Sequence, residues 1–134
     1  MNSSTAPEDP QQVIRDLAEI TPAELADDIR AAAAAVYARA QAWRRSPTFR
    51  GDRLHRKAYE VVVVAIAELD AVPTPRTHRE VGHLVDAIAP ILSAWWDDYP
   101  GPQKDLSDAV EALRRVAMHR TAWVRQARGL LGLD

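Results

Sequence analysis

Apolar residues recur at steps of three and four residues in four stretches of the chain, and a proline-containing segment closes each stretch. This spacing is typical of amphipathic α-helices, because residues three and four positions apart share one helix face. Proline ends helices, since it lacks a backbone N–H and restricts the residue before it. The pattern therefore predicts an all-α protein built mainly from four long helices.

The first long helix has the clearest start in the sequence. Thr21-Pro22-Ala23-Glu24 combines a capping box with a proline at the first helical position, and both features favour a helix beginning there. This helix is predicted to end near Arg45, before Ser46-Pro47. Asp9-Pro10 predicts a short additional helix over about residues 10–20. The inward stripe of the long helix is expected to hold Leu25, Ile29, Ala32, Val36, Ala40 and Trp43.

The second long helix is predicted to run from its N-cap Asp52 to Val72-Pro73. Its four consecutive valines, Val61 to Val64, could instead form a strand, because β-branched residues favour the pleated conformation. The flanking helical pattern favours a helix. Apolar residues surround the helix at 61–67, which predicts either a central position or a partner on its back face. The expected inward stripe is Leu54, Ala58, Val61, Ala65 and Leu69.

The third helix is predicted from about Pro75 or Thr77 to Asp98, with Thr77 and Glu80 spaced as a second capping box. Pro90 lies inside it and predicts a kink near residues 86–90. The fourth helix is predicted from about Pro102 to Leu131. Expected inward residues are Val81, Leu84, Ile88, Ile91 or Leu92, and Trp95 in the third helix, and Leu106, Val110, Leu113, Ala117, Val124, Ala127 and Leu131 in the fourth.

Short connections force consecutive helices to be antiparallel neighbours, so the expected fold is an antiparallel up-and-down four-helix bundle with a short extra N-terminal helix. The fourth helix is the longest, and the N-terminal helix is expected to cover its overhang. Residues 1–9 are predicted to be a disordered leader, and residues 10–134 a single domain. A chain of 134 residues with 47% hydrophobic content is sufficient for one core.

The composition limits the location and the chemistry of the protein. The chain has no cysteine, which excludes disulfides and thiolate metal sites and fits a reducing compartment. Its first ten residues lack the basic start and apolar run of a signal peptide, and its apolar runs are shorter than the ~20 residues of a membrane span. We therefore expect a small, soluble, cytoplasmic protein without membrane contact. The excess of arginine over lysine, with abundant alanine, indicates a bacterial genome rich in GC.

Charge is strongly segregated along the chain. Residues 39–57 carry a local formal charge of +6, and residues 86–111 carry −5, within a net charge of −2. In an antiparallel bundle both segments are expected at one end. Helix dipoles favour bases at helix ends, but Arg53, Arg56 and Lys57 lie at a helix start, and Asp97 and Asp98 lie at a helix end. Either these two groups neutralise each other, or the arginines face a partner.

Aromatic residues are predicted at the same end of the bundle. Adjacent Trp95 and Trp96 point about 100° apart on a helix, so both cannot face one core. A tryptophan left beside arginines has the composition of an interface hot spot. The second tryptophan could equally pack against a neighbouring helix. The predicted binding surface comprises Trp43, Arg44, Arg45, Phe49, Arg50, Arg53, Arg56 and Trp96.

This surface predicts a non-catalytic protein-protein interaction or assembly module, whose partner is another protein or a second copy of the chain in a homodimer. An alternative is a nucleic-acid-binding accessory protein that contacts phosphates through the 44–57 arginine cluster and stacks aromatic rings on unpaired bases. The net negative charge argues against this alternative, because nucleic-acid-binding domains are usually basic.

Motifs for catalysis are sparse. Glu80 and His83 have the E-x-x-H spacing of ferritin-like metal sites, but the chain lacks the second pair, so we expect no metal and no cofactor. An arginine followed closely by a histidine resembles the motif of the HEPN ribonucleases, and Arg50/His55, Arg76/His83 and Arg114/His119 match it. In a regular helix Arg115, rather than Arg114, shares a face with His119. This pair is the candidate site for the ribonuclease alternative.

Overall fold

The computed structural model describes residues 9–94 and 102–133, and within these ranges every regular element is helical. The prediction of an all-α protein is confirmed, and Val61 to Val64 lie in a helix rather than in a strand. The predicted leader falls, apart from Asp9, outside the described residues. The elements are α1 (Pro10–Ala18), α2 (Pro22–Arg44), α3 (Arg53–Ala71), α4 (Val81–Ser93), α5 (Pro102–Arg114), the π-helical turn η2 (Arg115–Arg120) and α6 (Thr121–Leu130).

Side-chain caps explain where α2 and α3 begin. Thr21 Oγ1 accepts a hydrogen bond from the Glu24 backbone N at 3.1 Å, and the Glu24 carboxylate accepts one from the Thr21 N at 3.1 Å. The predicted capping box is therefore present. Asp52 caps α3 by accepting a hydrogen bond from the His55 N at 2.9 Å, as expected.

The third predicted helix is shorter than expected, since α4 begins at Val81 and ends at Ser93. The Thr77 hydroxyl accepts from the Glu80 N as predicted, but the Glu80 carboxylate accepts from the Arg76 N instead of the Thr77 N. Residues 77–80 consequently form a hydrogen-bonded turn before the helix. Ala94 has extended backbone angles and ends α4, with Pro90 inside the helix.

The fourth predicted helix is continuous from Pro102 to Leu130 but contains the wide turn η2. The Thr121 hydroxyl donates to the Val116 carbonyl, five residues earlier, at 3.3 Å. A side-chain hydroxyl that bonds the backbone in this way competes with the regular α-helical pattern. Wide turns of this kind are often found at functional sites.

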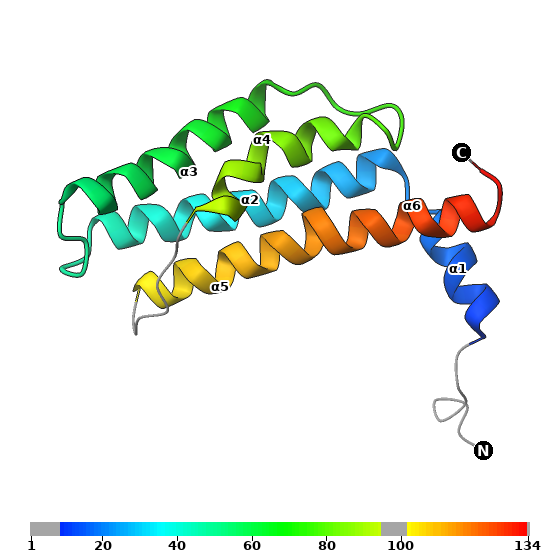
Figure 1. The fold of residues 1–134 in the computed structure, drawn as a ribbon, viewed down its shortest axis with the longest axis horizontal. Helices are drawn as coiled ribbons and strands as arrows, with labels where there is room; N and C mark the ends of the chain where they lie inside the picture. The colour runs from blue at the N-terminus through cyan, green and yellow to red at the C-terminus, as the bar shows by residue number, and fades with distance from the viewer. Residues whose placement is uncertain (1–8, 95–101, 134) are drawn as a thin grey trace, which may run out of the picture.

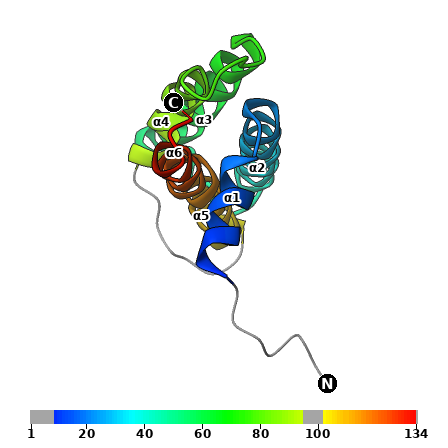
Figure 2. The ribbon, with the colours of Figure 1, turned by 90° about the vertical axis from the view of Figure 1, so that its right-hand side faces the viewer.

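Helix α2 lies at the centre of the arrangement, with α3 and α5 packed against it and α4 packed mainly on α3. Figure 1 shows that α2 and α4 run in one direction and α3 and α5 in the other. At the far end α1 crosses the bundle axis and contacts α6, as the axial view in Figure 2 also shows. Arg39 on α2 and Asp105 and Asp108 on α5 line one shallow hollow, so the late part of α2 adjoins the start of α5.

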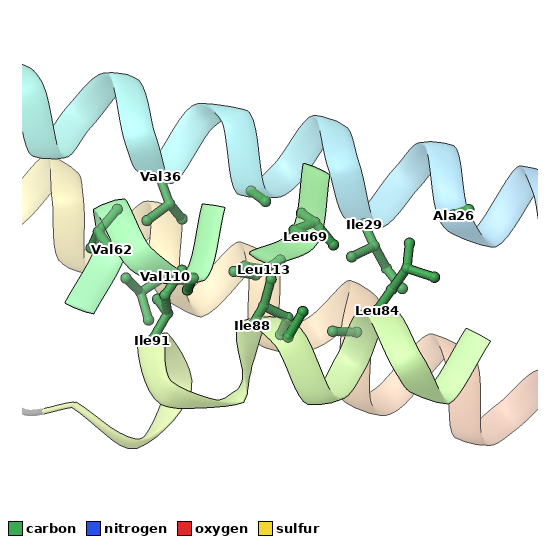
Figure 3. Packing of buried hydrophobic residues seen from close by; sticks show 14 of the residues in the cluster. Ala26, Ile29, Val36, Val62, Leu69, Leu84, Ile88, Ile91, Val110 and Leu113 are labelled. Atoms are coloured by element: carbon green, nitrogen blue, oxygen red, sulfur yellow. The ribbon is translucent and has the colours of Figure 1, made fainter. Parts of the chain in front are cut away.

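The core is formed by aliphatic side chains from α2, α3, α4 and α5, which meet between the helices (Figure 3). The inward stripes predicted for the third and fourth helices are confirmed over most of their described length. The register of α3 was predicted wrongly at its start, because Leu54 is 52% exposed and His55 is buried in its place. Residues in the core that Figure 3 labels include Ile29, Val36, Val62, Leu69, Leu84, Ile88, Ile91, Val110 and Leu113.

Two arginines connect neighbouring helices by binding helix C-termini. Arg30 on α2 donates to the carbonyls of Leu69 and Val72 at the end of α3, at 3.0 and 2.8 Å. Arg114 on α5 donates to the carbonyl of Leu92 near the end of α4 at 2.8 Å. Positive groups are favoured at helix C-termini, where carbonyls lack partners within the helix.

Within the described residues, no helix has the length and apolar character needed to cross a membrane.

Candidate interaction surface

The candidate surface lies at the end of the molecule where α2 passes into α3 (Figure 1). We call this end the hairpin pole and define it as residues 39–59, which comprise the last turns of α2, the loop 45–52 and the first turns of α3. Gly51 in the loop has a φ of 68°, a conformation that favours glycine. Asp52 follows it directly as the cap of α3, so the glycine allows the chain to reverse immediately before the helix.

An aromatic cluster holds the hairpin pole together. The ring of Trp43 meets that of Phe49 edge to face with centroids 4.8 Å apart, and the His55 ring lies 4.9 Å from Trp43. Phe49 also contacts Tyr59 edge to face, at 6.4 Å. Because the cluster joins α2, the loop and α3, it fixes the position of the loop on both helices.

A polar network around His55 reinforces the loop. The Arg50 backbone N donates to His55 Nδ1 at 3.0 Å, and a guanidinium nitrogen of Arg50 lies 3.2 Å from Nε2. Arg50 Nε also pairs with Asp52 Oδ2 at 3.1 Å. The His55 backbone N–H and, to a lesser extent, the Arg50 charge lower the pKa of the Asp52 carboxyl below its usual value. Arg50 is therefore bound by His55 and Asp52, two residues of the same hairpin.

Arg44 is also engaged inside the hairpin pole. Its guanidinium carbon lies 5.3 Å from the centroid of the Tyr59 ring, a cation–π contact between α2 and α3. The guanidinium covers one side of an aromatic residue that would otherwise be available to a ligand. Arg44 and Arg50 therefore act first as structural residues of the hairpin.

The remaining cations of the pole are exposed. None of them forms an ion pair with another described residue. They are Arg39, Arg45, Arg53, Arg56 and Lys57. The hypothesis that Asp97 and Asp98 neutralise them concerns residues outside the described part of the chain. Three of these cations lie in the first turns of α3, where the helix dipole is itself positive, so the pole concentrates positive charge.

The predicted binding residues thus separate into different roles. Trp43 is only 1% exposed, so a partner on this surface would not reach its ring, and Phe49 is half-buried. Arg45, Arg53 and Arg56 are exposed, whereas Arg44 and Arg50 have partners within the pole. Trp96 lies outside the described residues.

A second feature is a groove beside the wide turn η2, of about 550 Å³. Arg115 and His119 line it together with the 59% exposed Trp123 and with Leu17 and Ile20 near α1. Arg114 faces elsewhere, because it binds Glu111 and the Leu92 carbonyl. Sequence reasoning did not single out Trp123, although its position next to the inward Val124 was a signal of exposure.

The other two arginine and histidine pairs that match the motif lie outside this groove. Arg50 and His55 touch, but His55 is 4% exposed and belongs to the aromatic cluster. Arg76 and His83 line a small hollow with Glu80. No group of three described residues could hold a metal ion through histidine, cysteine or carboxylate ligands.

These observations define a small protein that is helical over its described residues and has a basic hairpin, held by aromatic and polar contacts, at one end. The chain matches no family model, and comparisons with curated proteins and with solved structures give no match.

Proposed function

We propose that the protein is a non-catalytic interaction module whose hairpin pole binds an acidic surface of another protein. The observation that carries the proposal is the set of exposed cations at the pole that form no ion pair with another described residue. The aromatic cluster and the His55 network hold the loop of the pole against α2 and α3. Like charges gathered in this way repel one another, and an acidic partner relieves the repulsion. We further propose that the module acts in the cytoplasm.

The architecture we propose for the module is an antiparallel up-and-down four-helix bundle with α1 as an extra helix. The alternating helix directions in Figure 1 support it, as do the contacts of α2 with α3 and α5 and of α3 with α4. Helices α4 and α5 contact each other far less, so the bundle is open on that side. In this arrangement the hairpin between α2 and α3 projects as one of its corners.

An acidic protein suits the hairpin pole better than a nucleic acid does. Binding of unpaired bases requires aromatic faces that are free to stack. Among the described aromatic residues of the pole, Trp43 is buried, Phe49 is half-buried and Arg44 lies over Tyr59. The pole therefore offers positive charge but no free stacking platform among these residues.

Binding of fluorescent poly-L-glutamate, measured by anisotropy at low and high salt, tests the proposal. We expect salt-sensitive binding that weakens about tenfold or more when Arg45, Arg53 and Arg56 are all replaced by alanine. The matched control replaces the same three arginines by lysine, which keeps the positive charge at each position, and should retain binding. Absence of binding at low salt, or equal losses in both triple variants, would refute the proposal.

The groove beside η2 supports a second candidate function, cleavage or binding of RNA. Arg115, His119 and the exposed Trp123 share its wall, which provides a phosphate partner, a proton-transfer group and a stacking surface. If the groove acts on RNA, purified protein should degrade a single-stranded RNA and the His119→Ala variant should not. A gel shift that weakens steeply with salt would indicate binding alone. If the protein shows neither cleavage nor a gel shift at low salt, this candidate function is excluded.

A further inference from the structure

The strongest unassigned feature is a cavity of about 940 Å³ at the end of the molecule opposite the hairpin pole. The turn between α1 and α2, the loop between α3 and α4, and α6 border this solvent-open cavity, and Figure 1 shows these three segments at the same end. Because its walls come from segments far apart in the sequence, the sequence pattern did not reveal it. Its location makes it independent of the function proposed for the hairpin pole.

The lining of the cavity is strongly basic. Four arginines, Arg76, Arg79, Arg125 and Arg128, face a single lining carboxylate, Glu19. The guanidinium groups of Arg76, Arg79 and Arg125 form no ion pair with the described residues. Arg128 is positioned by donating to the carbonyls of Ala18 and Leu133.

Two threonine hydroxyls also line the cavity, and one of them adds a hydrogen-bond donor. Thr21 Oγ1 and Thr77 Oγ1 each accept a hydrogen bond from a backbone N–H, of Glu24 and Glu80 respectively. A hydroxyl whose oxygen already accepts still has its own proton to donate. Both threonines line the cavity, but the Thr21 hydroxyl also hydrogen-bonds the Glu24 carboxylate, so the proton available to a ligand is that of Thr77.

This inventory defines the chemistry of the ligand. Guanidinium groups only donate and suit the planar, bidentate recognition of carboxylate and phosphate groups. Arg76, Arg79 and Arg125, which form no ion pair with the described residues, favour a ligand that brings more than one negative charge. A phosphate group carries several acceptor oxygens and up to two charges near neutral pH. The volume is within the range of cavities that hold small molecules, about 300–1,000 Å³.

We infer that this cavity is a binding site for a small molecule that carries a phosphate or diphosphate group. Arg79 and Arg125 approach the phosphate from the loop before α4 and from α6, and the hydroxyl of Thr77 completes the donor set. Binding joins α1, α2, the loop and α6 around one ligand. The bound protein is consequently more stable towards unfolding than the free protein.

Calorimetric titration with inorganic phosphate, pyrophosphate and ADP, at constant ionic strength set with sodium chloride, tests the inference. We expect pyrophosphate or ADP to bind saturably and to raise the Tm as concentration increases. Tighter binding of ADP than of pyrophosphate would identify a nucleoside as part of the ligand, and equal affinities would identify the diphosphate alone. No binding of any of the three would overturn the inference.

Variants locate the bound anion. Arg79→Ala and Arg125→Ala should each weaken binding about tenfold or more, since each loses charge-assisted hydrogen bonds. Arg125→Lys keeps the charge but not the planar fork, and should give an intermediate loss. The control Arg45→Ala removes one charge at the hairpin pole and should leave the affinity unchanged. An equal loss in the control would show non-specific attraction and contradict the site.

Discussion

His55 shows at the scale of one residue how a polar side chain becomes part of a core. Its ring lies between Trp43 and the half-buried Phe49, and it is 4% exposed. The cost of burying its Nδ1 is offset because the Arg50 backbone N donates to this atom. The loop before α3 thus supplies the partner that its own histidine requires.

Replacing His55 by alanine should destabilise the protein by about 2–4 kcal/mol, because it removes a packed ring and leaves the Arg50 N–H without its acceptor. Urea unfolding followed by circular dichroism measures this change. The matched control is His83→Ala, which alters an exposed histidine and should cost less than about 0.5 kcal/mol. Equal losses in the two variants would contradict the structural role of His55.

Asp52 should make the unfolding free energy depend on pH. Its pKa in the folded protein is lowered below the usual value of 3.8, so the unfolded chain takes up the proton first on acidification. The stabilisation is therefore fully present above about pH 4 to 5, and it is lost as the pH falls through the folded-state pKa. Asp52→Asn keeps a capping side chain without this titration.

The measurement compares unfolding free energies at about pH 6 and about pH 3, above and below the usual carboxyl pKa of 3.8. Wild-type protein should lose more stability between these values than Asp52→Asn does. Glu24, whose pKa is lowered mainly by the Thr21 backbone N–H, provides a second case in the Glu24→Gln variant. Identical acid sensitivity of wild type and Asp52→Asn would disprove the contribution of Asp52.

At the scale of helices, side chains from neighbouring elements complete the helix ends. Arg30 and Arg114 each cross from one helix to bind carbonyls near the C-terminal end of another. These contacts join α2 to α3 and α5 to α4. They are the more important because α4 and α5 otherwise touch little.

The Arg30→Ala variant should lose about 1–3 kcal/mol, since two carbonyls at the end of α3 lose a charged donor. Thermal and urea unfolding report the change. Arg39→Ala, on the same helix but exposed and without a described ion pair, is the control and should change stability by less than about 0.5 kcal/mol. An unchanged free energy of unfolding in the Arg30→Ala variant would mean that water replaces the guanidinium without cost.

Local sequence signals predicted the start of α2 and α3 correctly because capping involves residues only three positions apart. They failed for the start of α4, where the Glu80 carboxylate binds Arg76 rather than Thr77. The burial of His55 and the roles of Arg30 and Arg114 depend on contacts made after the helices pack. Of the candidate site, the sequence pattern therefore predicted the charge but not which arginines the fold would engage.

At the scale of the whole molecule, α3 exposes two valines on the side away from the core, next to the exposed Glu60 and Glu68. Val63 and Val64 are 37% and 55% exposed, although Val62 beside them is fully buried. Valines exposed on the side of α3 away from the core suit contact with another protein or a second copy of the chain. The face extends from the hairpin pole, so a partner could contact both.

Light scattering on the purified protein tests self-association through this face. We expect an assembly larger than a monomer in wild-type protein and a monomer in the Val64→Lys variant. Because Val64 is exposed, this substitution should change the unfolding free energy of the chain by less than about 0.5 kcal/mol. Ala34→Lys, on an exposed position of α2, is the control and should preserve the assembly. A wild-type monomer at all concentrations would count against self-association through α3.

The contact between α1 and α6 has a consequence for biosynthesis. Arg128 on α6 donates to the carbonyl of Ala18 on α1, across 110 residues of sequence. A nine-residue helix is too short to persist alone in water, so α1 cannot settle until α6 has left the ribosome. Docking of α1 is therefore expected only after α6 has been synthesised and has joined the bundle.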